Sequence, residues 1–273
     1  MKIWHRISLD REDEEVLIRL GIEYKKSYDP SGDYGLVFSI HEDDPRWPEI
    51  SHLAEERQTF NFPYTSFTDE EILAAEWVRL CTGFKRYYPQ PKRGMKWKSQ
   101  TFSHTCESCG LDFDQKAPFR IKKEPQMGKY DFVSPYWTYA IFCTQRVVER
   151  LESEGLRGYE VWPVMLHRED TPSQIVSQIV FPHVAGPGLD ERDKQDPEPC
   201  AECGVTKYAF HRRGYMRVKR SALRNDLDAQ LTHEWFGSDT KWGFREILIS
   251  NRFARLIVEE GWKGLILNTL QLV

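Results

Sequence analysis

Two stretches in the second half of the chain share one pattern of hydrophobic and polar positions. "IFCTQRVVERLESEGLRGYEVWPV" covers Ile141 to Val164, and "ILISNRFARLIVEEGWKGLILNTL" covers Ile247 to Leu270. Each starts with a short apolar run, continues with about ten residues whose apolar positions have helical spacing, and ends in a second apolar run. Each stretch therefore predicts a strand, a helix and a strand.

The ends of these two helices are predicted by matching residues. Thr144 and Ser250 are suited to the N-cap, and Gly155 and Gly261 are suited to the left-handed residue that ends a helix. At a constant offset of 106 residues, five pairs are identical: Ile141/Ile247, Arg146/Arg252, Glu154/Glu260, Gly155/Gly261 and Gly158/Gly264. We interpret the two stretches as an internal repeat, although two unrelated amphipathic helices that end in glycine would share part of this pattern.

The region before the repeat has different helix patterns. "SLDREDEEVLIRLGIEY" predicts a helix with an acidic first turn, capped near Ser8 or Asp10 and ended by Gly21. "SFTDEEILAAEWVRLCTGF" predicts a second helix, because Thr68 and Glu71 have the spacing of a capping box. On this prediction four residues line one face of that helix before Gly83: Leu73, Trp77, Leu80 and Cys81.

Proline-rich segments divide the chain. "YYPQPKRG" ends at Gly94, and "HVAGPGLDERDKQDPEP" ends at Pro199, next to Cys200. We therefore expect an α+β fold with an acidic N-terminal α/β region at 1–92, a first lobe at 93–190 and a second lobe at 191–273.

Composition places the chain among folded globular proteins. It has 273 residues, of which 40% are hydrophobic and 29% charged. The start lacks the apolar stretch of a secretory signal, and no apolar run reaches the length of a membrane span, so we expect a cytoplasmic protein without membrane partners. In the cytoplasm, paired cysteines favour metal or redox chemistry over structural disulfides.

Charge is unevenly distributed along the chain. The formal net charge is −4, yet residues 1–90 hold 11 Lys and Arg against 18 Asp and Glu. An acidic surface favours fast association with a basic protein, and an aromatic side chain could form its desolvated centre. The residues expected to bind such a partner are Glu42, Asp43, Asp44, Trp47, Asp69 and Glu70.

Two CxxCG motifs, "CESCG" and "CAECG", carry the clearest chemistry. Their cysteines are Cys106, Cys109, Cys200 and Cys203. A two-residue gap lets both sulfurs of a pair reach one ion, and a following glycine gives the backbone the freedom that such a turn requires. Four thiolates complete a tetrahedral shell around one Zn²⁺ and leave no open position for water, so the predicted zinc site is structural and not catalytic.

Other interpretations of these cysteines are two independent redox pairs or four unrelated buried thiols. A redox pair belongs to a strand-to-helix junction, whereas "LDFDQKAPFRIKK" after Gly110 reads as strand and loop. His104 could replace one thiolate. We expect Cys81 and Cys143 to be core residues.

Motifs of catalysis are lacking. The sequence has no glycine-rich phosphate loop, no nucleophile elbow and no HExxH, so we name no catalytic residue and expect no enzyme. The alternative function is nucleic-acid binding by the strip 207–224, which holds seven Lys and Arg without an acid and interleaves them with aromatic residues.

The doubled motif, followed in each half by a helix, Glu-Gly and a strand, resembles the double-CxxCG motif family, whose paralogues abound in myxobacteria. The resemblance covers 104–273 and is carried by Cys106, Cys109, Gly110, Cys200, Cys203, Gly204 and "SEGLRGYEVWPV". Members of that family include immunity proteins that protect a cell against a toxin delivered by its neighbours. The resemblance thus implies a cognate protein toxin as partner, although this chain places a long acidic region before its first motif.

Overall fold

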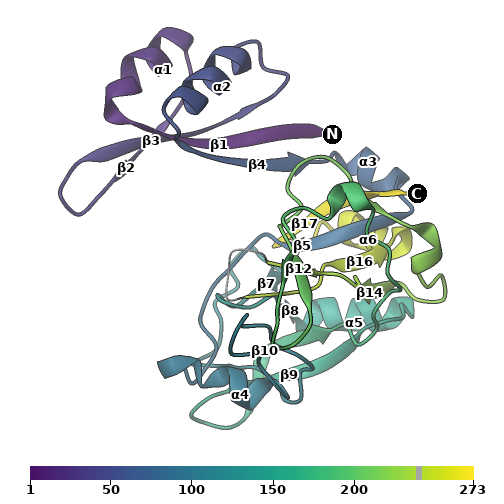
Figure 1. Cartoon of the computed structure of the whole chain (residues 1–273). Coiled ribbons are helices and arrows are strands. Elements are labelled where there is room, and N and C mark those ends of the chain that lie inside the picture. Colours follow the sequence, from purple (N-terminus) through teal and green to yellow (C-terminus); the bar gives the residue numbers. More distant parts are fainter. Residues whose placement is uncertain (238–241) are drawn as a thin grey trace. The chain divides into compact units, whose positions relative to one another are not determined.

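A computed structural model describes residues 1–237 and 242–273, and it confirms the expected α+β class (Figure 1). Contacts divide the chain into two units. The first comprises Met1–Thr68 together with Arg212–Gly214, and the second comprises Asp69–His211 and Tyr215–Val273. The division after residue 68 differs from the sequence boundary at 92, and both predicted lobes fall within the second unit except for Arg212–Gly214.

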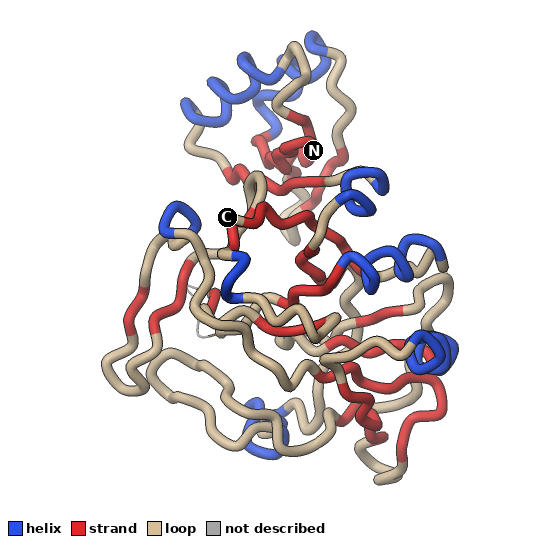
Figure 2. Tube along the Cα trace, turned by 90° about the vertical axis from the view of Figure 1, so that its right-hand side faces the viewer, coloured by secondary structure: helices blue, strands red, loops and turns tan. Residues whose placement is uncertain are grey.

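The first unit has a βαββαβ order. Its elements are β1 (Lys2–Asp10), α1 (Glu14–Leu20), β2 (Lys25–Tyr28), β3 (Tyr34–His41), α2 (Trp47–Glu56) and β4 (Phe60–Ser66), with a 3-10 turn at Arg11–Asp13. The sheet order is β2-β3-β1-β4, and every neighbouring pair is antiparallel. This is the split β-α-β arrangement. Both helices lie on one face of the sheet (Figures 1 and 2).

Alternation along the strands determines which side chains meet the helices. Ile7 and Leu9 of β1 and Phe38 of β3 point to the helix side and are buried. They pack with Leu17 of α1 and Ile50 of α2. Intervening residues of the same strands project to the opposite face, which no helix of this unit covers.

Sequence patterns near the N-terminus predicted the end of helix α1 and gave two candidates for its N-cap, Ser8 and Asp10. Gly21 ends α1 in the left-handed conformation, with φ of 63°. Asp10 is the N-cap residue of the 3-10 turn Arg11–Asp13 that leads into α1. Ser8, however, lies inside β1 and does not cap a helix. Strand β1 continues to Asp10 because β3 and β4 pair with it on both sides.

The helix predicted up to Gly83 is also wrong in its second half. Helix α3 covers only Asp69–Ala74, and Trp77–Thr82 form strand β5. Strand β5 pairs along both edges, with β16 and β17. Pairing on both edges with burial of its first four residues overrides the local helical preference.

The second unit is built from short elements. Its first half contains α3, β5, α4 (Trp97–Thr101), β6 (Arg120–Ile121), β7 (Phe132–Val133), β8 (Ile141–Thr144), α5 (Gln145–Glu154), β9 (Glu160–Leu166) and β10 (Pro172–Val180). Its second half contains β11 (Glu198–Pro199), β12 (Thr206–Tyr208), β13 (Met216–Val218), β14 (Ala229–Leu231), β15 (Trp235–Phe236), β16 (Ile247–Ser250), α6 (Asn251–Glu259) and β17 (Leu265–Leu272). Further 3-10 turns cover Arg93–Met95, Glu191–Asp193 and Arg220–Ala222.

Both predicted strand-helix-strand segments are present. Thr144 and Ser250 are the N-cap residues of α5 and α6. Gly155 and Gly261, at the ends of these helices, have φ of 63° and 61°. The capping residues of both helices were therefore predicted correctly.

Two five-stranded sheets in this unit have the same arrangement of parallel and antiparallel neighbours, although their central strands come from different points of the chain. Their orders are β6-β9-β10-β8-β7 and β13-β17-β5-β16-β14. In each sheet the first two strands are parallel and the remaining neighbours are antiparallel. Strand β5, from early in the chain, thus occupies the central place that β10 occupies in the first sheet.

The registers of the two sheets also agree. In the first, Gln178 of β10 pairs with Phe142 and Trp162. In the second, Arg79 of β5 pairs with Leu248 and Asn268, which lie 106 residues further along than those two partners. The structure thus shows the offset of 106 residues between equivalent strand partners in the two sheets. That the two halves arose by duplication of one segment stays a prediction.

Each half also presents a loop to the edge strand of the other half. The Arg157 carbonyl accepts hydrogen bonds from the N–H groups of Asp228 and Ala229, at 2.8 and 3.1 Å. The Lys263 carbonyl accepts from Asp131 and Phe132, at 2.9 and 3.0 Å. The two sets of contacts are equivalent, so the halves bind each other reciprocally.

Glycine is required at the centre of both contacts. A Cβ added at Gly158 would lie 2.1 Å from the Ala229 carbonyl oxygen, and one added at Gly264 would lie 2.1 Å from that of Phe132. Both glycines also have positive φ, 99° and 109°. Any side chain at these positions would separate the two halves.

We expect Gly158→Ala and Gly264→Ala each to lower the free energy of unfolding by at least about 2 kcal/mol, because backbone strain and overpacking add together. Gly155→Ala is the matched control, since it has positive φ but nothing within 4 Å of its added Cβ. That variant should lose only about 1 kcal/mol. Urea unfolding followed by tryptophan fluorescence measures the difference, and equal losses would show that the contact does not matter.

Candidate metal centre

The four motif cysteines lie in two turns of the same construction. The Cys106 N–H donates to the Leu111 carbonyl at 2.9 Å, and the Cys200 N–H donates to that of Val205 at 2.9 Å. The glycine after each pair donates back to the carbonyl of its first cysteine, from Gly110 at 2.8 Å and from Gly204 at 2.9 Å.

Both glycines have the left-handed conformation for which the motif predicted them. The φ angles are 71° at Gly110 and 72° at Gly204. The second turn joins β11 to β12, and the first lies between the bridged residues Thr105 and Asp112. The Thr105 hydroxyl donates to the Asp112 carboxylate at 2.6 Å, which closes the first turn.

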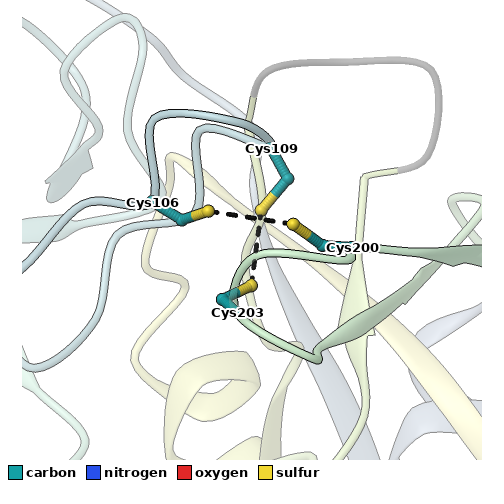
Figure 3. A group of neighbouring side chains, drawn as sticks. All are labelled: Cys106, Cys109, Cys200 and Cys203. Carbon is teal, nitrogen blue, oxygen red and sulfur yellow. Dashed lines mark hydrogen bonds between the residues drawn. The ribbon is translucent and has the colours of Figure 1, made fainter.

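The four sulfur atoms of these turns point toward one centre (Figure 3). All four lie within 4.8 Å of one another. Close sulfur–sulfur distances join different motifs, 3.8 Å from Cys106 to Cys200 and 3.7 Å from Cys109 to Cys203. Four sulfurs bound tetrahedrally at about 2.3 Å from zinc lie about 3.8 Å apart, so the spacing fits that ion.

Ionisation of all four thiols would also require a cation between them. Burial raises the pKa of the Cys109 thiol to about 12, whereas N–H groups of Cys203 and Glu202 lower the pKa of Cys200 to about 6. Thiols this close cannot all ionise in a largely buried site unless a positive charge offsets their repulsion. A divalent ion supplies that charge, and the residues present fit structural Zn²⁺.

Two lysines contact the turns, and the sequence predicted neither as part of the metal site; Lys207 was assigned instead to the basic strip 207–224. Lys98 donates from Nζ to the Gly110 carbonyl and lies near the Asp112 carboxylate, both at 3.1 Å. Lys207 is fully buried and donates from Nζ to the Cys109 carbonyl at 3.3 Å. Because four thiolates around Zn²⁺ would carry a net charge of about −2, these ammonium groups would stabilise the filled site. Nothing in the pattern around either lysine could have indicated this role.

The remaining candidate ligands lie elsewhere. Among the described residues the cluster consists of the four cysteines, and His104 stacks on Phe113. Cys143 is buried in β8, as predicted, and burial raises the pKa of its thiol. Cys81 is half-buried on β5, and its sulfur lies 3.6 Å from Asn268 Nδ2.

The residues predicted to bind a partner have mixed environments. Glu42 binds Arg213 at 2.9 and 3.1 Å and also His5 at 2.8 Å, and Arg213 lowers the pKa of its carboxyl. Asp44 binds Arg46 through two hydrogen bonds. Asp43 is exposed, while Trp47 is half-buried and stacks on His5. Asp69 and Glu70 are exposed in the first turn of α3, in the second unit.

Most cations of the strip 207–224 have acidic partners. Lys207 lies 3.7 Å from Glu198 beneath the metal centre. Four arginines form ion pairs: Arg213 with Glu42, Arg217 with Asp193, Arg220 with Glu76 and Arg224 with Asp226. Cations already paired with carboxylates have less charge to offer phosphates.

In the described residues no helix is long and apolar enough to cross a membrane.

We expect purified protein to carry about one zinc per chain. Serine at any one of the four motif cysteines should reduce zinc content and lower Tm by at least about 10 °C, because a structural zinc contributes several kcal/mol of folding free energy. Cys81→Ser is the control and should keep its zinc. Metal analysis with thermal unfolding tests this, and a metal-free protein of equal stability would contradict it.

Lys207→Met should weaken zinc affinity about tenfold, since outer-shell changes typically cost 10–100-fold. Lys194→Met, which removes a half-buried ammonium paired with the exposed Glu191, should leave the affinity unchanged. Competition with a chromogenic chelator measures both. Equal affinities would mean that the buried ammonium does not stabilise the thiolates.

Comparison with protein-family models finds no match, and comparison with curated proteins finds no relative of this chain. The likeness to the double-CxxCG motif family therefore stays a hypothesis, carried by the two turns and the helices that follow them.

Proposed function

We propose that this chain is a non-enzymatic binding protein whose second unit is held together by one structural zinc, and that it acts as an immunity protein against a cognate toxin. The observation that supports the zinc-containing, non-enzymatic part of this proposal is the four-cysteine cluster. Each half of the second unit contributes one turn, and four thiolates leave no coordination position for a substrate. The immunity role comes from the resemblance to the double-CxxCG motif family.

Exposed acidic residues near the helices of the first unit favour a toxin with a basic surface. Three exposed acids near the start of α1 and the end of α2 have no cation within ion-pair distance in the described chain: Glu12, Glu15 and Glu55. The two ends lie together, because Arg57 after α2 binds Asp13 before α1 at 3.1 Å. We place the toxin contact here, since Glu42 and Asp44 already hold arginines. Unpaired carboxylates steer a basic protein more effectively than neutralised ones.

To test the role, the chain is co-expressed with each neighbouring gene product that arrests growth. The chain should restore growth against one of them and bind it directly. Glu12→Lys, Glu15→Lys and Glu55→Lys together should slow association about tenfold at low salt. The matched control reverses three exposed acids of the second unit: Glu149, Glu152 and Glu169.

Loss of protection with unchanged zinc content, in the first triple variant only, would support the helix side as the docking surface. Equal loss in both triple variants would show a general charge effect. If no neighbouring product is toxic, or if none is neutralised, the immunity role is wrong while the zinc site remains.

A further inference from the structure

The sheet of the first unit carries aromatic and basic side chains on the face opposite α1 and α2. Residues of β1 and β4 that project to this side pair across the strands as Trp4 with Tyr64 and Arg6 with Phe62, and Ser8 pairs with Phe60. The exposed fraction is 63% for Phe60 and 37% for Tyr64. Trp4 and Phe62 beside them are half-buried. Neighbouring aromatic rings that stay accessible to solvent are often part of a binding surface, because burial would stabilise them.

The rings are arranged in near-parallel pairs. Trp4 and Tyr64 have centroids 6.4 Å apart at 11°, and Phe60 and Phe62 are 6.2 Å apart at 19°. Alternate residues of a strand lie about 6.8 Å apart, which places one ring after another along β4. A row of this kind offers successive flat surfaces to the bases of an extended single strand.

Cations accompany the aromatic row. Arg6 is exposed beside Phe62, and Lys25 projects from β2 to the same side. Within the described chain neither has an acid at ion-pair distance. The Arg212 guanidinium, which belongs to this unit, lies 4.2 Å from the centroid of the Phe62 ring. The face is thus basic although the unit as a whole is acidic.

A groove follows this face. Its volume is about 1130 Å³, and its lining includes Arg6, Lys25, Phe60, Phe62 and Tyr64. Among the described residues that line it, Glu23 is the one acid. Stacking surfaces next to unpaired cations complement a ligand that has planar rings on an anionic backbone.

We propose that this face, defined by Trp4, Arg6, Lys25, Phe60, Phe62 and Tyr64, binds single-stranded nucleic acid by stacking bases on its rings and placing phosphates near its cations. A duplex does not fit, because its bases are already stacked and paired inside. The site is separate from the metal centre and from the acidic helix side, and it does not depend on the immunity role. It also differs from the strip 207–224, most of whose cations are paired.

The test uses full-length protein and fluorescein-labelled 12-mers of oligo(U) and oligo(dT), with a 12-bp duplex as the third probe. Fluorescence anisotropy at 50 and 200 mM salt should show tighter binding of a single strand than of the duplex. Affinity should fall about twentyfold across that range if about three phosphates are contacted. The ratio of the two single-strand affinities distinguishes RNA from DNA as the natural ligand.

Variants locate the binding. Phe60→Ala and Tyr64→Ala should each weaken it about tenfold through lost stacking, and Arg6→Glu should weaken it and flatten the salt dependence. Ile18→Ala and Arg19→Glu on α1 are the matched controls, because both residues are exposed on the helix side. Circular dichroism confirms that each variant is folded.

Three outcomes would overturn the proposal. These are the absence of binding to either single strand at 50 mM salt, duplex binding of equal strength, and equal losses in the α1 controls. If Phe60→Ala and Tyr64→Ala instead abolish toxin neutralisation while nucleic acid does not bind, the face docks a protein and the proposal is wrong.

Discussion

A close approach between a glycine and a carbonyl group, made twice, fixes how the two halves of the second unit meet. Gly158 lies against Ala229, and Gly264 lies against Phe132, with no room for a side chain at either point. Each contact fills the space that the other half leaves beside its edge strand. The Arg157 and Lys263 carbonyls, next to these glycines in the chain, accept the hydrogen bonds that join each half to the edge strand of the other.

The cysteine cluster adds a second link between the same halves. Cys106 and Cys109 come from one half, and Cys200 and Cys203 from the other. Zinc bound by all four would connect the halves through four bonds to one ion, and Lys207 would reduce the electrostatic cost of the thiolates. Hydrogen bonds and metal coordination would then oppose the same separation at two places.

Features that depend on residues close together in the sequence, such as the cysteine turns and the capped helices, could be predicted. Cysteine spacing predicted the cluster, and Gly110 and Gly204 adopt the backbone that the motif requires. Hydrophobic periodicity with Thr144, Ser250, Gly155 and Gly261 predicted α5 and α6. It failed at Trp77–Thr82, because those residues become a strand only through partners far along the chain. For the same reason no pattern could reveal that Lys207 lies beneath Cys109 or that Arg6 lies beside Phe62.

The position of β5 has a consequence for biosynthesis. Leu80 finds its partners in Ile247 and Leu267, so the central strand of the second sheet leaves the ribosome long before either neighbour exists. Contacts so distant in sequence form slowly. Until β16 and β17 have been synthesised, β5 has two unpaired edges, and a strand with unpaired edges is prone to aggregation. The first five-stranded sheet, whose strands all lie between Arg120 and Val180, can form during this interval. Completion of the second sheet is therefore delayed until β17, at Leu265–Leu272, has been synthesised.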